Sequence, residues 1–335
     1  MAERENKKEM SEEERLKQMA AQMREREYRG LSEEEIQERE KQKEMQRKKN
    51  IAILDDTLTI LEQGGYSKDC RHIKLDFSAE QMREIQVFLP KDLTSLALTG
   101  QNETQAHNAS CFFDCENEDA LVLAQKEYQN LKKNGEPVPQ VLVLNLASAT
   151  QPGGRTRSGA NAQEEDLCRR TSLLLSLESE NAKKYYEYNN ARKTRMGSDA
   201  IMLSPYVEVI KDASSETLSE PFSISVMSCA APMIRLGLEG MSQREYEEML
   251  YKRIQGMLLV AASHNYRHLI LGAFGCGVYG NDAATVSDLF AGAIRNFNFA
   301  GMDSERLFDS ILFAVLCKHG NDYNYREFCR NFSRT

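Results

Sequence analysis

The sequence predicts a protein of the α/β class, a sandwich of helices around one mixed β-sheet. Short apolar runs typical of buried strands alternate with amphipathic helical segments along much of the 335-residue chain. Two of these runs end in glycine-rich turns, at the strand ends where such a sheet usually binds a ligand. We therefore expect one α/β domain whose function resides in two loops.

Residues 1–49 differ from the rest, because nearly all of them are charged or carry an amide. Ser32 and Glu35 have the spacing of a capping box, which predicts that a helix restarts after Gly30. This composition is typical of a charged N-terminal tail or a solvated helix. A helix that binds a partner, or one that packs on the domain as a lid, is the alternative.

The globular part is predicted to begin at residue 50 and to run to residue 335. It opens with "IAILDDTLTILEQGGY", in which the apolar residues share one helical face: Ile51, Leu54, Leu58 and Leu61. Gly64 and Gly65 follow, as glycines do at the C-terminal ends of helices. This segment is therefore predicted to be the first helix of the domain.

Later elements follow from short patterns. Residues 140–147, "QVLVLNLA", predict a buried strand, and "AIMLSPYVEVI" and "FSISVMSCAAP" predict two more. Ser242 and Glu245 cap a long amphipathic helix that leads into a further buried strand, "HLILGAF". A helix, "AATVSDLFAGAIRNF", a strand, "SILFAVLC", and a short helix, "NYREFCRNF", are expected to complete the domain.

Composition excludes several classes of protein. No apolar run reaches 18 residues and the N-terminus lacks a secretory signal, so we expect no membrane association. The five histidines are scattered and the eight cysteines form no CxxC pair, so we expect no metal site and no cofactor. Reduced thiols indicate a cytoplasmic protein, or a nuclear one in a eukaryote. The net charge of −8 argues against binding to duplex nucleic acid.

The second of the two loops, residues 275–281, lacks the lysine and Ser/Thr of a P-loop and does not have the context of a Rossmann fingerprint. Its glycines have two interpretations. They permit positive φ in a turn and nothing more, or they allow successive backbone amides to approach a diphosphate. The loop alone does not separate these.

The first loop, residues 151–165, ends in Gln-Glu-Glu. Acidic residues in the first turn of a helix are stabilised by its macrodipole, which explains Glu164 and Glu165 without any function. The preceding glycines, with few side chains large enough to pack, suggest instead a loop that closes over a sugar diphosphate. On that interpretation a carboxyl group lies beside the anomeric carbon.

With both loops considered, the sequence resembles the microbial-type poly(ADP-ribose) glycohydrolases of the macrodomain superfamily. That family has a Gly-Gly-Gly loop followed by Gln-Glu-Glu, and this chain has "PGGRTRSGANAQEE". "KNIAILDDTLTILEQGGY", "DAIMLSPYVEVIKD", "SVMSCAAP" and "LILGAFGCGVYGND" resemble further family segments in the same order. The resemblance covers about residues 50–332. It implies a three-layer α/β/α macrodomain-like sandwich with an N-terminal helical extension.

The resemblance also implies an activity, hydrolysis of ribose–ribose O-glycosidic bonds in poly(ADP-ribose) to release ADP-ribose. Glu165 matches the catalytic acid/base, while Glu164 and Gln163 match residues that position the substrate ribose. Gly153 and Gly154 match the loop along the phosphates. The second phosphate loop is matched by Gly275, Cys276, Gly277 and Val278. Tyr279 is expected to pack on the ribose, with Asn145 and Ser148 as weaker ribose contacts.

One position departs from the family pattern, because Arg155 replaces the third glycine. Its side chain either narrows the diphosphate site or points outward and adds a phosphate contact. The expected partner is an ADP-ribose polymer or an ADP-ribosylated protein. Two other functions are alternatives, removal of single ADP-ribose units from acceptors and binding of ADP-ribose without cleavage.

Overall fold

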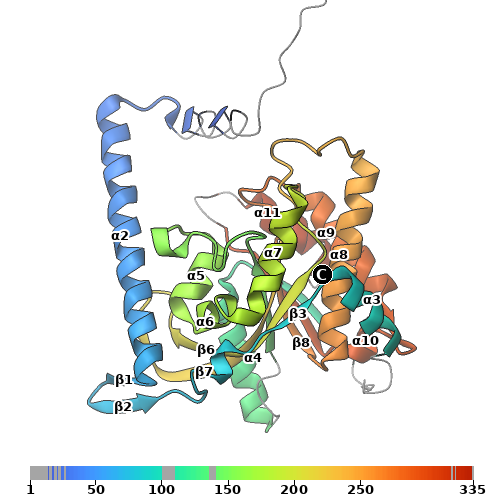
Figure 1. The fold of residues 1–335 in the computed structure, drawn as a ribbon, viewed down its shortest axis with the longest axis horizontal. Helices are drawn as coiled ribbons and strands as arrows, with labels where there is room; N and C mark the ends of the chain where they lie inside the picture. Colours follow the sequence, from blue (N-terminus) through green and yellow to red (C-terminus); the bar gives the residue numbers. More distant parts are fainter. Residues whose placement is uncertain are drawn as a thin grey trace, which may run out of the picture.

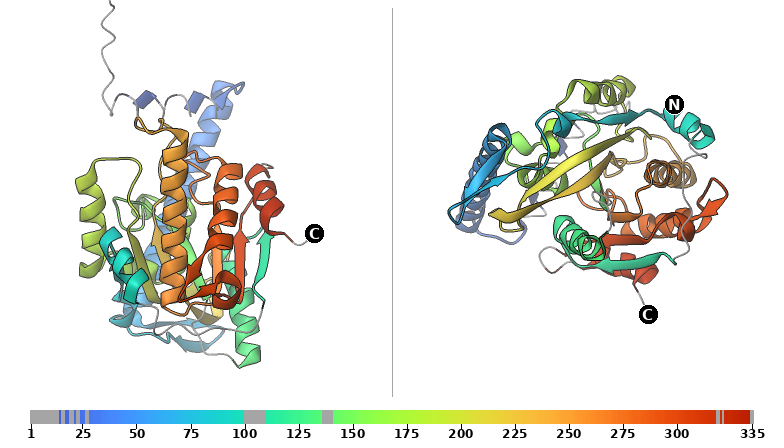
Figure 2. Two further views of the ribbon diagram at one scale, coloured as in Figure 1. Left: turned by 90° about the vertical axis from the view of Figure 1, so that its right-hand side faces the viewer. Right: turned by 90° about the horizontal axis from the view of Figure 1, so that it is seen from below.

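The computed structural model describes residues 28–99, 110–135, 141–317, 320 and 322–333, with isolated helical positions between 14 and 25. Its strands form one central sheet that is covered by helices on both faces, as the ribbon views show (Figures 1 and 2). The predicted α/β sandwich around a mixed sheet is confirmed. None of the helices in the described ranges is long and apolar enough to cross a membrane.

Helix α2, Glu33–Gln63, is the first long element. Ser32 caps it and forms the predicted box with Glu35, whose backbone N–H is 3.3 Å from the Ser32 hydroxyl. Gly64 ends the helix in the left-handed conformation. The helix runs unbroken through residue 49, so the proposed domain boundary there stays a prediction. Most of residues 1–27 lie outside the described residues.

Several elements between α2 and the first central strand have no counterpart in our sequence analysis. The first are a hairpin and a 3-10 turn: β1 Gly65–Lys68, β2 Arg71–Lys74 and η1 Gln81–Arg83. Two strands and two helices follow: β3 Gln86–Phe88, α3 Pro90–Thr99, β4 Phe112–Glu116 and α4 Ala120–Asn134. Strands β3 and β4 are the two edges of the main sheet. Because edge strands are short and half-exposed, their apolar pattern is weak.

The main sheet has seven strands in the order β3-β6-β7-β5-β8-β11-β4. The five strands from β7 to β4 are parallel, while β6 is antiparallel to both of its neighbours. Its central strands are those predicted from apolar runs: β5 Val141–Leu146, β6 Ile201–Lys211, β7 Thr217–Cys229, β8 His268–Gly272 and β11 Ser310–Ala314. The sheet is therefore mixed, as expected.

Each face of the sheet has its own core. Along β5, Leu142 and Leu144 pack into one core, whereas Val141 and Val143 pack into the other. Helices α8 Gln243–Ser263, α9 Ala283–Asn296 and α11 Tyr323–Phe332 cover the first face together with α3. The second is covered by α2, α4, α5 Gln163–Arg170, α6 Leu173–Leu177 and α7 Lys183–Arg192. Both faces are thus buried, which explains the continuous apolar strands.

Helix α2 also supports the loop that follows β5. Asn50 is buried and its side-chain amide donates to the carbonyl of Gly159, at 2.9 Å. Thr57 donates to the carbonyl of Arg169 at the end of α5, at 2.5 Å. Gly159 has φ +75°, and a Cβ there would overlap the Arg47 carbonyl and lie 2.8 Å from the Arg47 Cα. This close approach of two backbones requires glycine.

We expect Gly159→Ala to destabilise the protein by about 2 kcal/mol, because the methyl group pushes the loop away from α2. Gly64→Ala is the matched control, since Gly64 has φ +68° but nothing near its absent Cβ. Both variants introduce backbone strain of about 1 kcal/mol, but only Gly159→Ala also introduces a steric clash. The difference between their unfolding free energies in urea therefore measures the clash. Equal losses of stability would contradict the contact.

Candidate active site

The candidate site lies at the carboxyl ends of β5, β7 and β8, which are adjacent parallel strands. The loop after β5 contains the 3-10 turn η3, Thr156–Ser158, and leads into α5 at Gln163. Glu164 and Glu165 therefore lie in the first turn of α5, as predicted. Both side chains are buried, with exposed fractions of 3% and 7%. They are not surface charges.

Glu164 is held by the strand beneath it and by the loop. One carboxylate oxygen accepts from the Asn145 side-chain amide at 3.3 Å, and the other accepts from the Ser148 backbone N–H at 2.8 Å. Asn145 is fully buried in β5, and its amide also donates to the hydroxyl of Ser228 on β7, at 3.0 Å. The register of the two strands pairs Asn145 with Ser228. Asn145 and Ser148 thus contact Glu164, while their predicted contacts with ribose stay predictions.

Burial raises the pKa of Glu164 from 4.5 to about 8. Desolvation of the carboxylate is the main cause, and the neighbouring charge of Glu165 adds to it. The hydrogen bonds from Ser148 and Asn145 oppose the shift but do not cancel it. The Glu164 carboxyl therefore keeps its proton to a higher pH than an ordinary glutamate does.

Glu165 accepts two backbone N–H groups, one from Arg155 at 3.0 Å and one from Ala162 at 3.1 Å. The loop and the start of α5 therefore fix both carboxylate oxygens. Gly154, with φ +58°, lies directly against both carboxyls. A Cβ at Gly154 would lie 2.7 Å from a Glu165 oxygen and 2.9 Å from a Glu164 oxygen. Both carboxyls are thus packed against this glycine, at a distance that leaves no room for a larger residue.

Gln163 contacts strand β5. Its side chain accepts from the backbone N–H of Leu146 and donates to the carbonyl of Leu144, both at 2.8 Å. Strand β8 pairs with β5 only as far as Val143. Beyond that residue, the Gln163 side-chain amide pairs with the backbone N–H of Leu146 and the carbonyl of Leu144 in place of a neighbouring strand. The structure thereby gives Gln163 a role in attaching α5 to the sheet. Its predicted contact with ribose stays a prediction.

Gly153 has φ +63°, and a Cβ there would lie 2.7 Å from Leu174 and 3.0 Å from the Cys168 sulfur. It keeps the loop close to α5 and α6. Arg155 has φ −108°, a conformation that needs no glycine, so the departure from the family pattern causes no backbone strain. The Arg155 side chain is exposed. Both alternatives for this side chain, a narrowed diphosphate site and an added phosphate contact, stay predictions.

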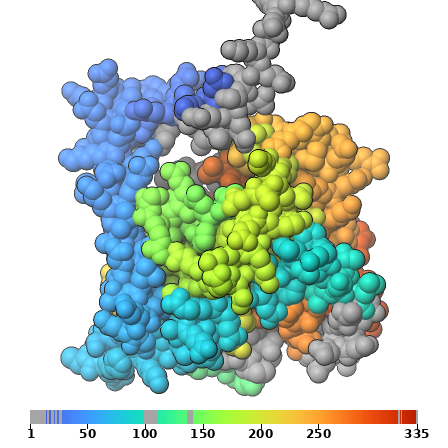
Figure 3. Space-filling view, in the orientation of Figure 1, coloured from blue at the N-terminus to red at the C-terminus, as the bar shows by residue number. Residues whose placement is uncertain are grey.

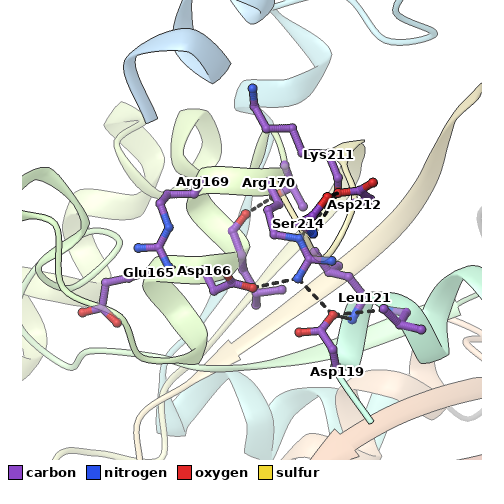
Figure 4. Close-up of polar contacts among 12 residues, drawn as sticks. Asp119, Leu121, Glu165, Asp166, Arg169, Arg170, Lys211, Asp212 and Ser214 are labelled. Carbon is purple, nitrogen blue, oxygen red and sulfur yellow. Dashed lines mark hydrogen bonds and ion pairs between the residues drawn. The ribbon is translucent and has the colours of Figure 1, made fainter. Parts of the chain in front are cut away.

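The far end of α5 is anchored by buried arginines (Figure 4). Arg170 pairs with Asp119 at 3.0 Å and with Asp166 at 2.8 Å. Arg169 donates to the carbonyl of Ala160 at 2.6 Å, on the loop that precedes the helix. Glu165 points away from the Arg170 cluster in this view, although Asp166 is the next residue. The helix therefore holds its first turn rigidly while leaving the Glu165 carboxyl to the site.

The second loop, after β8, is fixed by two residues that our sequence analysis missed. The buried Asn281 donates to the carbonyls of Pro232 and Gly275, at 2.8 and 2.9 Å, and accepts from the Tyr246 hydroxyl. Arg235 donates to the carbonyls of Val278 and Gly277, at 2.7 and 2.9 Å. Its own backbone N–H donates to the Tyr279 carbonyl at 3.0 Å. The segment after β7 thus clamps the loop from Gly275 to Asn281.

The predicted residues of this loop differ in their surroundings. Gly275 has φ +75° and its absent Cβ would lie 2.7 Å from Ala231, whereas Gly277 has open space around it. Cys276 is half-buried, and burial raises the pKa of its thiol to about 12. The Val278 side chain is exposed. We therefore expect Cys276 and Val278 to act through their backbones.

Tyr279 lies in the second loop. Its pKa is raised, mainly by burial and then by the charges of Glu164 and Glu165. The loops after β5 and β8 leave the sheet at the carboxyl ends of adjacent parallel strands, the edge where such sheets bind ligands. No group of three His, Cys, Asp or Glu side chains in the described ranges is arranged to hold a metal ion.

The catalytic-domain model of microbial-type PARG, poly(ADP-ribose) glycohydrolase, matches residues 54–212. The X-ray structure of poly(ADP-ribose) glycohydrolase from Thermomonospora curvata is 31% identical, with a TM-score of 0.74, and the match covers 85% of this chain and 99% of that one. The chain belongs to the microbial-type poly(ADP-ribose) glycohydrolases. The family predicted from the two loops is confirmed.

Two further structures resemble this glycohydrolase. The T. curvata enzyme bound to the inhibitor ADP-HPD is 29% identical with a TM-score of 0.72, covering 85% of this chain and 99% of that one. The Deinococcus radiodurans enzyme in complex with ADP-ribose is 27% identical with a TM-score of 0.65, covering 77% and 98%. Comparison with curated proteins gives no match.

The glycohydrolase family match includes the first loop and both glutamates but ends before the second loop. For the second loop, only the resemblance of "GCGVYGND" to the family sequence indicated a role in the site. Asn281 lies within this string, so its position next to a glycine turn was a usable signal. Arg235 lies in a segment, residues 230–242, whose pattern predicts only a loop.

The pKa of Glu164 predicts a specific pH dependence of stability in this glycohydrolase. Because the folded-state pKa is raised, the contribution of Glu164 is fully present below pH 4.5 and is lost as pH rises through about 8. We expect the unfolding free energy of Glu164→Gln to exceed that of the wild type increasingly over this range, by about 5 kcal/mol at pH 9. Urea unfolding from pH 5 to pH 9 measures the difference. The variant Glu62→Gln, at an exposed position, is the control. If the unfolding free energies of Glu164→Gln and the wild type changed with pH in the same way, the raised pKa of Glu164 would be contradicted.

Proposed function

We propose that Glu165 is the general acid/base with which this enzyme hydrolyses the ribose–ribose O-glycosidic bond of poly(ADP-ribose). One observation carries the assignment. The Glu165 carboxyl is buried and held by two backbone amides, and it lies beside Glu164 against the bare backbone of Gly154, where the loop after β5 meets the start of α5. A catalytic acid must be fixed in this way at a position that a substrate atom can reach.

In the proposed reaction, the bond between the anomeric carbon and the leaving ribose oxygen breaks as Glu165 gives its proton to that oxygen. The anomeric carbon acquires oxocarbenium character, which the negative diphosphate of the same ADP-ribose unit stabilises. Water then attacks the carbon and returns a proton to the Glu165 carboxylate. The products are ADP-ribose and a polymer shortened by one unit.

Glu164 has a different role in the proposal, since its environment differs. Its raised pKa, about 8, favours the neutral carboxyl near pH 7, so Glu164 adds no negative charge beside the group that donates the proton. Asn145 and Ser148 hold its carboxyl in place. We assign Glu164 to the positioning of the ribose next to the bond that breaks. Gln163 supports both glutamates through strand β5.

The two loops are assigned to the diphosphate and the neighbouring ribose. Gly153 and Gly154 expose the backbone of the first loop, and the second loop contributes its backbone from Gly275 to Val278. Tyr279 packs on the ribose from the second loop, at the position where both carboxyls influence it. The exposed Arg155 adds a positive charge at the edge of the first loop. ADP-ribose polymer is the expected partner.

The eight cysteines are all free, with Cys111, Cys115, Cys168 and Cys229 buried. Buried unpaired thiols suit a reducing compartment. We therefore propose a cytoplasmic enzyme.

Replacing Glu165 tests the proposal. Glu165→Gln removes the transferable proton but keeps the size of the side chain, so we expect kcat on poly(ADP-ribose) to fall by about 10²–10⁴-fold. Binding of ADP-ribose, measured by calorimetry, is expected to persist. Glu62→Gln, at an exposed position of α2, serves as the matched control. Turnover near the wild-type rate in the Glu165 variant would overturn the assignment.

Arg235→Ala tests whether the second loop needs its clamp. Loss of the two bonds to Gly277 and Val278 is expected to raise KM about tenfold and to change kcat less, because the loop must be ordered on binding. Arg235→Lys is expected to rescue little, since one ammonium does not reproduce the planar fork. Arg244→Ala on α8 is the control. A fall in kcat alone would argue against a positioning role.

A further inference from the structure

The first half of α2 projects from the domain. Residues 33–49 are almost all exposed, and Asn50 is the first fully buried residue of the helix. The ribbon views show this half of α2 extending past the site-bearing edge of the sheet (Figures 1 and 2). In the space-filling view it rises above the green segment that contains η3 and α5 (Figure 3). It is therefore an arm beside the candidate site.

Three cations of this arm share the face that meets the domain. Arg39, Lys43 and Arg47 are spaced by four residues, and Arg47 is three residues before the buried Asn50. Residues three and four apart lie on one side of a helix. All three side chains are exposed. We name these residues the basic ridge.

The basic ridge reaches the edge of the active site through direct contacts. The Arg47 backbone lies against Gly159, whose carbonyl accepts from Asn50 at 2.9 Å. Four residues before Gly159, Arg155 has an exposed side chain and donates its backbone N–H to Glu165. The loop of residues 155–159 therefore links the Glu165 carboxyl and the exposed Arg155 to the arm at Arg47.

The local charge is positive although the whole protein carries −8. Residues 39–49 contain six basic residues and two acidic ones, Glu40 and Glu44. Glu40 pairs with Arg24 at 2.6 Å, outside the ridge, and Glu44 lies 3.8 Å from Lys48 and 3.9 Å from Arg47. Glu40 is thus paired outside the ridge, whereas Glu44 lies near both Lys48 and the ridge residue Arg47. The ridge is a local cluster of positive charge on a protein whose net negative charge repels polyanions.

We propose that the basic ridge binds the diphosphate groups of poly(ADP-ribose) that extend beyond the unit held in the active site. The inference rests on the proposed function, because it concerns the rest of the same substrate. A polymer carries a diphosphate in every unit, and the units next to the reacting one must extend out of the active site. Where they extend past Arg155 toward α2, the ridge offers their diphosphates cations at regular spacing. It would favour long chains over short ones.

The test compares two triple variants with the same change of charge. Arg39→Glu/Lys43→Glu/Arg47→Glu reverses the ridge, while Lys41→Glu/Lys48→Glu/Lys49→Glu reverses exposed cations on other faces of the arm. For long fractionated poly(ADP-ribose), the ridge variant is expected to raise KM about tenfold and the control less than twofold. For the two-unit oligomer, both variants should keep the wild-type kcat and KM. The salt dependence of KM for long polymer should be shallower in the ridge variant.

Other results would overturn the inference. Equal changes in the two triple variants would indicate a general charge effect, and an equal loss on long and short substrates would indicate a structural role for the ridge. Loss of binding to single-stranded RNA with an unchanged KM for polymer would assign the ridge to nucleic acid. A wild-type enzyme that cleaves neither substrate would refute the proposed function itself. Thermal unfolding of each variant checks that the arm and domain remain folded.

Discussion

The attachment of α5 to the end of β5 is the constraint on which the site depends. The Gln163 amide replaces a neighbouring strand by bonding Leu146 and Leu144, at the point where β8 stops pairing with β5. The next two residues of the helix, Glu164 and Glu165, are thereby placed at the end of β5. The orientation of Glu164 and Glu165 is thus set by main-chain hydrogen bonds of the sheet. A helix held only by apolar contacts would permit rotations that move both carboxyls.

The same attachment explains how neighbouring glutamates acquire different properties. Glu164 points back to Asn145 and Ser148 and is almost completely desolvated, whereas Glu165 bonds with the loop at Arg155 and Ala162. One residue of helical rotation separates a carboxyl directed at the sheet from one directed at the loop. Proximity alone would perturb the pair, but it is the burial of Glu164 that contributes most to its raised pKa. Different roles for the two carboxyls follow from this arrangement.

Local patterns predicted the parts of the fold that depend on near neighbours. The capping boxes at Ser32 and Ser242, the Gly64 stop and the five central strands all involve residues within a few positions of each other. The pairing of Gln163 with β5 spans 17 to 19 residues, and that of Asn281 with Pro232 spans 49. The hydrophobic periodicity of a sequence does not predict contacts between residues so far apart along the chain. The continuity of α2 through residue 49 was also hidden, because a change from charged to apolar composition alters burial without ending a helix.

The two halves of helix α2 have different surroundings. From Asn50 onward it buries residues against the domain and holds the loop at Gly159 and the end of α5 at Arg169. Before Asn50 it has no core to cover, and its charged residues keep it in water. A rigid helix transmits its orientation along its length, so the contacts that fix the catalytic loop also fix the arm. The distance of the basic ridge from Glu165 is hence determined by the packing at Gly159, where two backbones meet without an intervening side chain.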